Sequence, residues 1–216
     1  MPPTANAVFG ARLPVAERYA EFLATAGVER GLLGPREGAR LWERHLVNSA
    51  VLVELLPGTG DVIDVGSGAG LPGIPLAILR PELSVTLVEP MQRRTAFLEE
   101  CVSLLELENV SVVRGRAEDL AGEIAADVVV ARAVAPLDRL LRWTLPLVRP
   151  GGQVLAIKGA KVAEELTALG LSTEPGRQVP RRALRTLGVE TVELVCVGDE
   201  IVDPPATVVR ATRSGR

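Results

Sequence analysis

The stretch that most constrains the fold is a short apolar run that ends in closely spaced glycines. Residues 62–65 (Val-Ile-Asp-Val) predict a short buried strand. Four glycines follow it: Gly66, Gly68, Gly70 and Gly73. Residues 74–79 then predict the first turns of a helix. A strand, a glycine turn and a helix in this order are how an open parallel sheet presents its backbone to a nucleotide-like ligand, because glycine tolerates positive φ and close approach.

The glycines fit two cofactor patterns. Counted from Gly68 they satisfy G-x-G-x-x-G, the dinucleotide fingerprint, but that frame starts three residues beyond the strand and contains a proline. Counted from the strand end they give Asp64-x-Gly66-x-Gly68-x-Gly70, the glycine signature of methyltransferases that use S-adenosylmethionine (SAM). An acidic residue should then hold the ribose hydroxyls, and Glu89 ends the next apolar run, about 20 residues after the first glycine. This spacing favours SAM over a dinucleotide.

Length and composition place limits on the class of protein. The 216 residues suit one domain, with a helical part at 1–57 and a SAM-binding α/β core at 58–216. A formal charge of −3 argues against a basic nucleic-acid coat but not against a local basic patch. Cys101 and Cys196 are too few for a disulfide framework or a zinc site, and both predict small buried side chains. No stretch reaches ~18 apolar residues and no leader opens the chain. We expect a cytoplasmic, metal-free monomer away from membranes.

Strands and helices alternate from residue 61 onward. Strands are expected at 61–65, 84–89, 110–114, 127–132, 152–158, 189–197 and 206–211. Helices are expected at about 14–26, 35–56, 73–80, 91–107, 136–148 and 161–169, and residues 1–13 are expected to be loose. Such alternation predicts a parallel sheet covered by helices. The last two strands have no helix between them and should form an antiparallel hairpin at the sheet edge. Seven mostly parallel strands with an antiparallel last one fit the Rossmann-like class I SAM-dependent methyltransferase fold better than a dehydrogenase, and we expect this fold.

Candidate site residues lie where successive strands end. Ala117 and Glu118 follow the third strand, where a backbone N–H and a carboxylate can recognise adenine; Glu118 could equally favour a helix N-terminus. Arg132 ends the fourth strand and offers a planar fork for phosphate, carboxylate or a guanine edge, or a surface ion pair. Lys158 ends the fifth strand and adds a second cation, which suggests an anionic substrate. The Asn/Asp-Pro-Pro-aromatic segment of amino-group methyltransferases is absent after the fourth strand, and neither cysteine is placed as a nucleophile.

Further basic residues could bind phosphates. Arg93 and Arg94 open the helix after Glu89, close to the same edge. Four more arginines follow in a polar segment: Arg177, Arg181, Arg182 and Arg185. Together they could form a patch with salt-dependent phosphate binding, or be charged helix ends and a solvated loop. His45 is the single histidine; it could be structural, or it could contact RNA or a flipped base.

At this point the motifs match a known family. They are Glu43-Arg44-His45-Leu46-Val47-Asn48-Ser49, the stretch from Asp64 to Pro75, Arg94-x-x-Phe97-Leu98, Arg132-Ala133 and Lys158-Gly159. They resemble the small-subunit ribosomal RNA methyltransferase G family (RsmG, also called GidB) over about residues 35–160. The Gly-Leu-Pro-Gly-Ile-Pro extension is far more specific than the glycines alone. Two features depart from the family pattern, Gly31-Leu-Leu-Gly34 ahead of the His45 helix and Asn48 within it, and both concern the substrate side.

The resemblance implies a bacterial, cytoplasmic class I enzyme that moves the SAM methyl group to N7 of one guanosine in 16S rRNA of the small ribosomal subunit. By position, the family's cofactor contacts fall on Gly66, Leu71, Ala117, Glu118 and Arg132. Guanine N7 already carries an in-plane lone pair, so positioning alone can supply much of the acceleration.

We expect three residues to act on the RNA: Arg132, Lys158 and His45. The alternative is a SAM-dependent methyltransferase of a small molecule or a protein. RNA binding whose affinity falls steeply with salt would distinguish the two.

Overall fold

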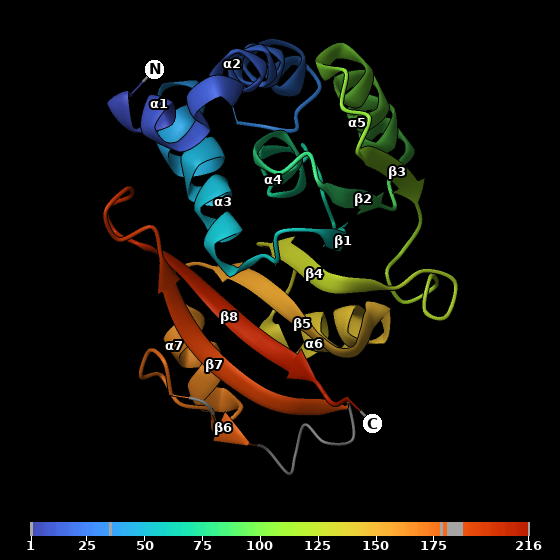
Figure 1. Ribbon diagram of the computed structural model, residues 1–216, viewed down its shortest axis with the longest axis vertical. Helices are drawn as coiled ribbons and strands as arrows, with labels where there is room; N and C mark the ends of the chain where they lie inside the picture. Colours follow the sequence, from blue (N-terminus) through green and yellow to red (C-terminus); the bar gives the residue numbers. More distant parts are fainter. Residues whose placement is uncertain (1, 35, 178, 181–187, 216) are drawn as a thin grey trace.

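The computed structural model describes residues 2–34, 36–177, 179–180 and 188–215. Its centre is one twisted sheet with the strand order β3-β2-β1-β4-β5-β8-β7-β6 (Figure 1). The strands are β1 (Gly60–Val65), β2 (Leu83–Glu89), β3 (Val110–Arg114), β4 (Ala126–Arg132), β5 (Val148–Lys158), β6 (Val179–Pro180), β7 (Val189–Val197) and β8 (Ala206–Arg213). The first five are parallel, whereas β8 runs antiparallel to both β5 and β7.

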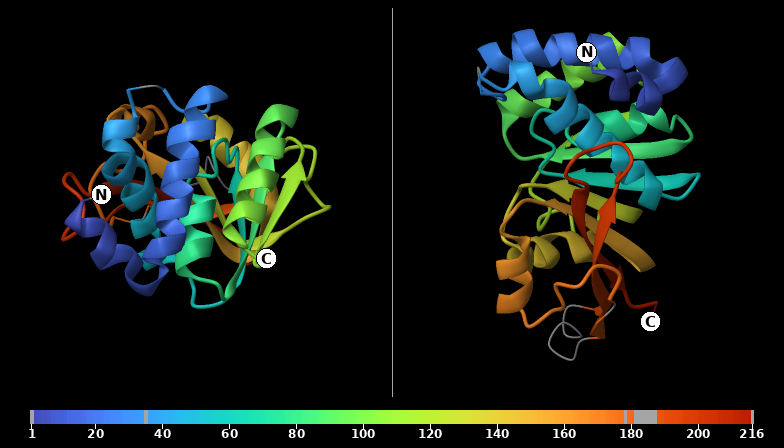
Figure 2. Two further views of the ribbon diagram at one scale, coloured as in Figure 1. Left: turned by 90° about the horizontal axis from the view of Figure 1, so that it is seen from above. Right: turned by 90° about the vertical axis from the view of Figure 1, so that its left-hand side faces the viewer.

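Helices cover both faces of the sheet, as a parallel sheet requires. One face carries α1 (Pro3–Phe9), α2 (Leu13–Phe22), α3 (Asn48–Ala50), α4 (Gly73–Leu79) and α5 (Gln92–Leu105), whereas α6 (Leu137–Thr144) and α7 (Val162–Ala168) lie on the other. Short 3₁₀-helical segments are found at Gly10–Arg12, Gly38–Arg40, Val51–Leu55 and Leu145–Leu147, and π-helical segments at Leu23–Gly27 and Leu41–Val47. Figure 1 and Figure 2 show α2 beside α5 on the same side of the sheet.

Each face of the sheet has its own aliphatic core. The first packs the N-terminal helices, α4 and α5 against the sheet, with Tyr19, Leu46 and Phe97 fully buried. The second packs α6 and α7 against the other face, around residues such as Val129 and Leu140. The N-terminal residues therefore share a core with the sheet instead of forming a separate unit.

The class I methyltransferase fold predicted from the sequence is confirmed, including the antiparallel pairing of the last strand. The short β6 makes an eighth strand that the sequence did not indicate. The strand β8 lies between β5 and β7, so the hairpin joins the sheet through its second strand.

Two local predictions are wrong. Residues 3–9 form α1 because Ala5 and Phe9 bury their side chains, and the Phe9 ring meets Trp42 edge-on at 6.2 Å between centroids. Cys196 is exposed, whereas Cys101 is buried as predicted. Arg181, Arg182 and Arg185 of the predicted basic patch lie outside the described residues.

Candidate active site

A cavity of about 660 Å³ lies where β1, β2 and β4 end. Its walls come from the glycine turn after β1, the β2 end, the segment after β3, the β4 end and the N-terminal helices. The volume falls within the usual range for small-molecule sites. Several predicted site residues line it: His45, Gly66, Gly68, Leu71, Glu89, Arg94, Ala117, Glu118 and Arg132.

The glycine turn leaves no room for side chains at two points. Gly66 has φ +70°, and a Cβ there would approach Val134 Cγ2 to 2.9 Å. Gly70 has φ +100°, and a Cβ would come within 2.4 Å of Ile74 Cδ1. These positions require glycine both for the backbone angle and for the space beside Val134 and Ile74. Gly66 and Gly68 present bare backbone to the cavity.

Asp64 supports this turn from beneath. Its side chain is fully buried, and its Oδ2 accepts a hydrogen bond from the Gly73 backbone N–H at 3.0 Å. The Ser67 hydroxyl donates to the Asp64 backbone carbonyl at 2.9 Å. Burial raises the pKa of the Asp64 carboxyl to about 7. Asp64 thus connects both ends of the turn, and among the described residues it is not part of the cavity wall.

Glu89, at the end of β2, is 1% exposed and holds the neighbouring backbone. Its Oε2 accepts the Gly68 N–H at 3.1 Å and its Oε1 accepts the Met91 N–H at 3.0 Å. Arg94 lies 3.6 Å from Oε2 through Nη1. A carboxylate oxygen can accept more than one hydrogen bond, so each oxygen keeps capacity for a ligand hydroxyl.

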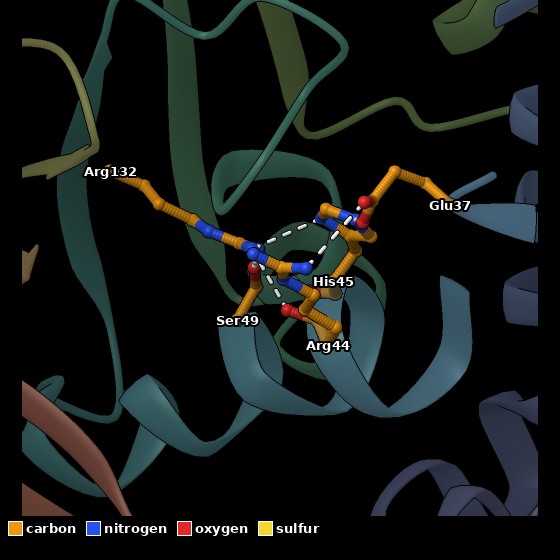
Figure 3. A network of polar contacts seen from close by, with 5 residues as sticks. All are labelled: Glu37, Arg44, His45, Ser49 and Arg132. Atoms are coloured by element: carbon orange, nitrogen blue, oxygen red, sulfur yellow. Dashed lines mark hydrogen bonds and ion pairs between the residues drawn. The ribbon is translucent and has the colours of Figure 1, made fainter. Parts of the chain in front are cut away.

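Arg132, at the end of β4, is tied to the N-terminal helical segment (Figure 3). Its Nη1 donates to the His45 carbonyl at 3.1 Å and to the Ser49 hydroxyl at 2.8 Å, and its Nη2 donates to the Arg44 carbonyl at 2.8 Å. Its Nη2 also lies 3.1 Å from His45 Nδ1. Burial lowers the pKa of the Arg132 guanidinium from its ordinary value. The planar fork predicted to meet an anion therefore joins β4 to the helices while still lining the cavity.

These contacts fix the tautomer of His45. A guanidinium can only donate, so Nδ1 must accept from Arg132. The ring proton then lies on Nε2 and is donated to Glu37 Oε2 at 2.7 Å. Burial lowers the pKa of His45, against the opposing effect of Glu37. The imidazole is accordingly neutral, with both nitrogens engaged.

Lys158, at the end of β5, is placed differently from the prediction. Its ammonium pairs with Glu165 Oε2 at 2.6 Å and donates to the Ala135 carbonyl at 3.0 Å, and its side chain is 6% exposed. The same Glu165 oxygen accepts the Leu137 N–H at 2.7 Å. The pair therefore holds the segment that connects β4 to α6. Among the described residues, the cavity wall includes neither Lys158 nor Arg93 nor Gly70.

Sequence reasoning missed several residues around the cavity. Leu32 and Leu33 reach it from the connection between the N-terminal helices, and Trp143 reaches it from α6. Tyr19 and Glu37 hold wall residues through hydrogen bonds. These side chains come from segments far along the chain from the glycine turn, and no local pattern marks them.

The site residues fit SAM. The positive-φ glycines give close access to backbone, Glu89 retains acceptors for ribose hydroxyls, and Ala117 and Glu118 lie together on the wall.

Within the described residues no cluster of three or more His, Cys, Asp or Glu side chains gathers as a metal site. No helix there has both the length and the apolar character to cross a membrane.

A family model described as "GidB: rRNA small subunit methyltransferase G" matches residues 12–175. The chain belongs to this ribosomal RNA small subunit methyltransferase G family. Relatives bearing that name include proteins of Thermobifida fusca, 57% identical over 96% of this chain and 83% of theirs, and of Streptomyces coelicolor, 54% identical over 97% and 84%.

Solved structures agree at the level of the fold. The methyltransferase SibL in its apo form has a TM-score of 0.59 at 22% identity, over 93% of this chain and 70% of its own. M. jannaschii TYW2 in complex with AdoMet has a TM-score of 0.57 at 18% identity, over 80% of this chain and 77% of its own. These structures confirm the fold alone. The family model and the relatives confirm the resemblance to the methyltransferase G family and the SAM-dependent methyltransferase activity, and a small-molecule or protein substrate is not favoured.

Proposed function

We propose that this member of the methyltransferase G family transfers the methyl group of SAM to N7 of a guanosine in 16S rRNA. The state of His45 is the observation that supports N7 most directly. Both imidazole nitrogens are engaged, by Arg132 and Glu37, so the ring is not free to take a proton from a substrate. Guanine N7 presents a lone pair with no proton to remove, so it needs no general base.

The residues of the chain act by binding and orientation. When bound, SAM supplies an electrophilic methyl group on its sulfonium. The glycine turn and Glu89 hold the cofactor end of the cavity, and Arg132 and His45 form the wall beside it. Alignment of a lone pair with the methyl group can supply much of the rate enhancement. Methylation at N7 leaves the base positively charged, so a nearby carboxylate or carbonyl would favour this product.

The proposed setting is the cytoplasm, with the protein acting as a monomer on 16S rRNA or on the small subunit. Arg93 and Arg94 begin α5 beside the cavity and would contact RNA phosphates. Arg94 lies on the wall itself and also approaches Glu89. Lys158 supports this surface by holding the β4–α6 connection.

The test is methyl transfer from labelled SAM to naked 16S rRNA and to small-subunit particles, followed by nuclease mapping of the modified base. We expect label at N7 of a single guanosine. Glu89→Gln should abolish labelling by weakening SAM binding, whereas Glu190→Gln, at an exposed position on β7, should leave it intact. Label on an exocyclic nitrogen, a ribose or a protein would overturn the N7 assignment.

A further inference from the structure

A buried tyrosine on the N-terminal helix α2 contacts the glycine turn. Tyr19 is the single tyrosine of the chain, and its side chain is completely buried. Its hydroxyl donates to the backbone carbonyl of Ala69 at 2.8 Å, across 50 residues of sequence. Ala69 lies in the glycine turn and lines the cavity. A residue far outside the cofactor motif therefore holds the motif's backbone directly.

The Tyr19 hydroxyl also lies close to Gly70, the residue after Ala69. A Cβ built at Gly70 would lie 3.0 Å from the Tyr19 oxygen, so a side chain at residue 70 would crowd the hydroxyl. Burial holds the pKa of the Tyr19 phenol well above its ordinary value, so the hydroxyl stays protonated and remains a donor. Removal of the oxygen alone would leave the ring packing unchanged and the Ala69 carbonyl without this donor.

The glycine turn needs such support because its glycines are free to adopt many conformations. Three of them have positive φ: Gly66, Gly68 and Gly70. Asp64 fixes the end of the turn through Gly73, and Glu89 fixes Gly68 from the side of β2. Tyr19 fixes the middle from the opposite layer. Holding a binding loop in its bound conformation raises affinity by lowering the entropy lost on binding.

We propose that Tyr19 is a positioning residue for the cofactor, which fixes the glycine turn through the Ala69 carbonyl in the conformation that binds SAM. The proposal rests on SAM binding at this cavity, as in the proposed function. It gives the N-terminal helices a part in cofactor affinity as well as in RNA contact.

The experiment compares Tyr19→Phe with wild type by calorimetric titration with SAM and by steady-state kinetics. Loss of one buried hydrogen bond should weaken SAM binding roughly tenfold. The KM for SAM should rise by a similar factor, while the KM for rRNA and kcat at saturating SAM stay unchanged, because the turn is ordered again once SAM is bound. Thr144→Val is the matched control, since it also removes a buried hydroxyl that donates to a backbone carbonyl, that of Leu140 at 2.8 Å.

The control separates affinity from stability. Both variants should melt at a lower temperature, but only Tyr19→Phe should lose SAM affinity. Equal SAM affinity in Tyr19→Phe and wild type would overturn the inference and leave the proposed function standing. Wild-type protein that fails to bind SAM would overturn both.

A second measurement does not depend on the folding of the variant. Wild-type protein carrying ¹³Cζ-labelled tyrosine should give one resonance, from Tyr19. SAM should shift this resonance because Ala69 lines the cavity, whereas guanosine alone should not. A resonance unmoved by saturating SAM would contradict a link between the hydroxyl and the cofactor.

Discussion

The guanidinium of Arg132 lies 3.1 Å from Nδ1 of His45, and this contact joins the end of β4 to the N-terminal helices (Figure 3). Because a guanidinium only donates, the contact exists with a neutral ring and is lost when Nδ1 is protonated. Protonation of Nδ1 therefore removes one of the contacts that join these two walls of the cavity, while the hydrogen bonds of Arg132 to the Arg44 and His45 carbonyls and to the Ser49 hydroxyl remain.

The first prediction concerns pH. The folded pKa of His45 lies below its ordinary value of 6.5, so the unfolded chain takes up the proton first as the pH falls. The stability contributed by neutral His45 is complete above pH 6.5 and is lost as the pH drops through the folded pKa. Asp64, whose pKa is raised to about 7, titrates in the same range with the opposite effect on stability, so the decline should appear as the difference between wild type and His45→Gln in denaturant unfolding between pH 5 and 8. The single imidazole should titrate below 6.5 by NMR. An unchanged slope in His45→Gln would contradict the assignment.

The second prediction concerns the fork of Arg132. Arg132→Lys keeps the charge but cannot reach the Arg44 carbonyl, the Ser49 hydroxyl and His45 together. We expect a loss of about 2 kcal/mol in the free energy of unfolding, with methyl transfer reduced even at saturating SAM. Arg142→Lys, at an exposed position on α6, is the control and should behave as wild type in urea titrations and in the assay. Full activity of Arg132→Lys would show that the fork is dispensable.

The third prediction separates support of the chain from RNA contact. Lys158 is paired with Glu165, so Lys158→Gln and Glu165→Gln should each destabilise the protein, with a coupling of about 1–2 kcal/mol in a double-mutant cycle. The salt dependence of RNA binding should be unchanged in Lys158→Gln, whereas Arg93→Gln should reduce the slope by about 1. A reduced slope in Lys158→Gln would restore Lys158 as a direct phosphate contact.

The fourth prediction concerns Gly66 and Val134. Gly66→Ala places a Cβ 2.9 Å from Val134 Cγ2 in a backbone conformation with φ +70°. SAM affinity should fall at least about tenfold, because the strained turn costs roughly 1–2 kcal/mol before the clash is counted. Val134→Ala in the same chain should remove the clash but not the backbone strain, so calorimetry should show partial recovery. Complete recovery of SAM affinity, or no recovery at all, would contradict the conclusion that both the clash and the backbone strain weaken binding.

The sequence predicted the elements that repeat a local rule. The strand before Gly66, the acidic end of β2 at Glu89 and the alternation of strands and helices each follow from spacing that the chain displays within a few residues. The wall residues Ala117, Glu118 and Arg132 were found because parallel strands end at one edge.

What the sequence could not reveal depends on contacts across the fold. Lys158 looks like a free cation at a strand end until Glu165, on α7, is brought against it. Residues 3–9 show no helical pattern in the sequence, and the contact of the Phe9 ring with Trp42 is visible only in the folded protein. Tyr19 carries no cofactor pattern of its own, since its partner is a backbone carbonyl that any sequence would supply.

The placement of β8 between β5 and β7 affects the order in which the protein can assemble during synthesis. The strand β7 leaves the ribosome before β8. In the described part of the chain it is joined to the parallel strands only through its hydrogen bonds to β8, which in turn pairs with β5. Until residues 206–213 emerge, β7 has no route to the parallel strands, and β5 has an open edge on that side. The cofactor motif, which follows β1 in the middle of the sheet, is thus made before β8, the strand that joins β7 to the rest of the sheet.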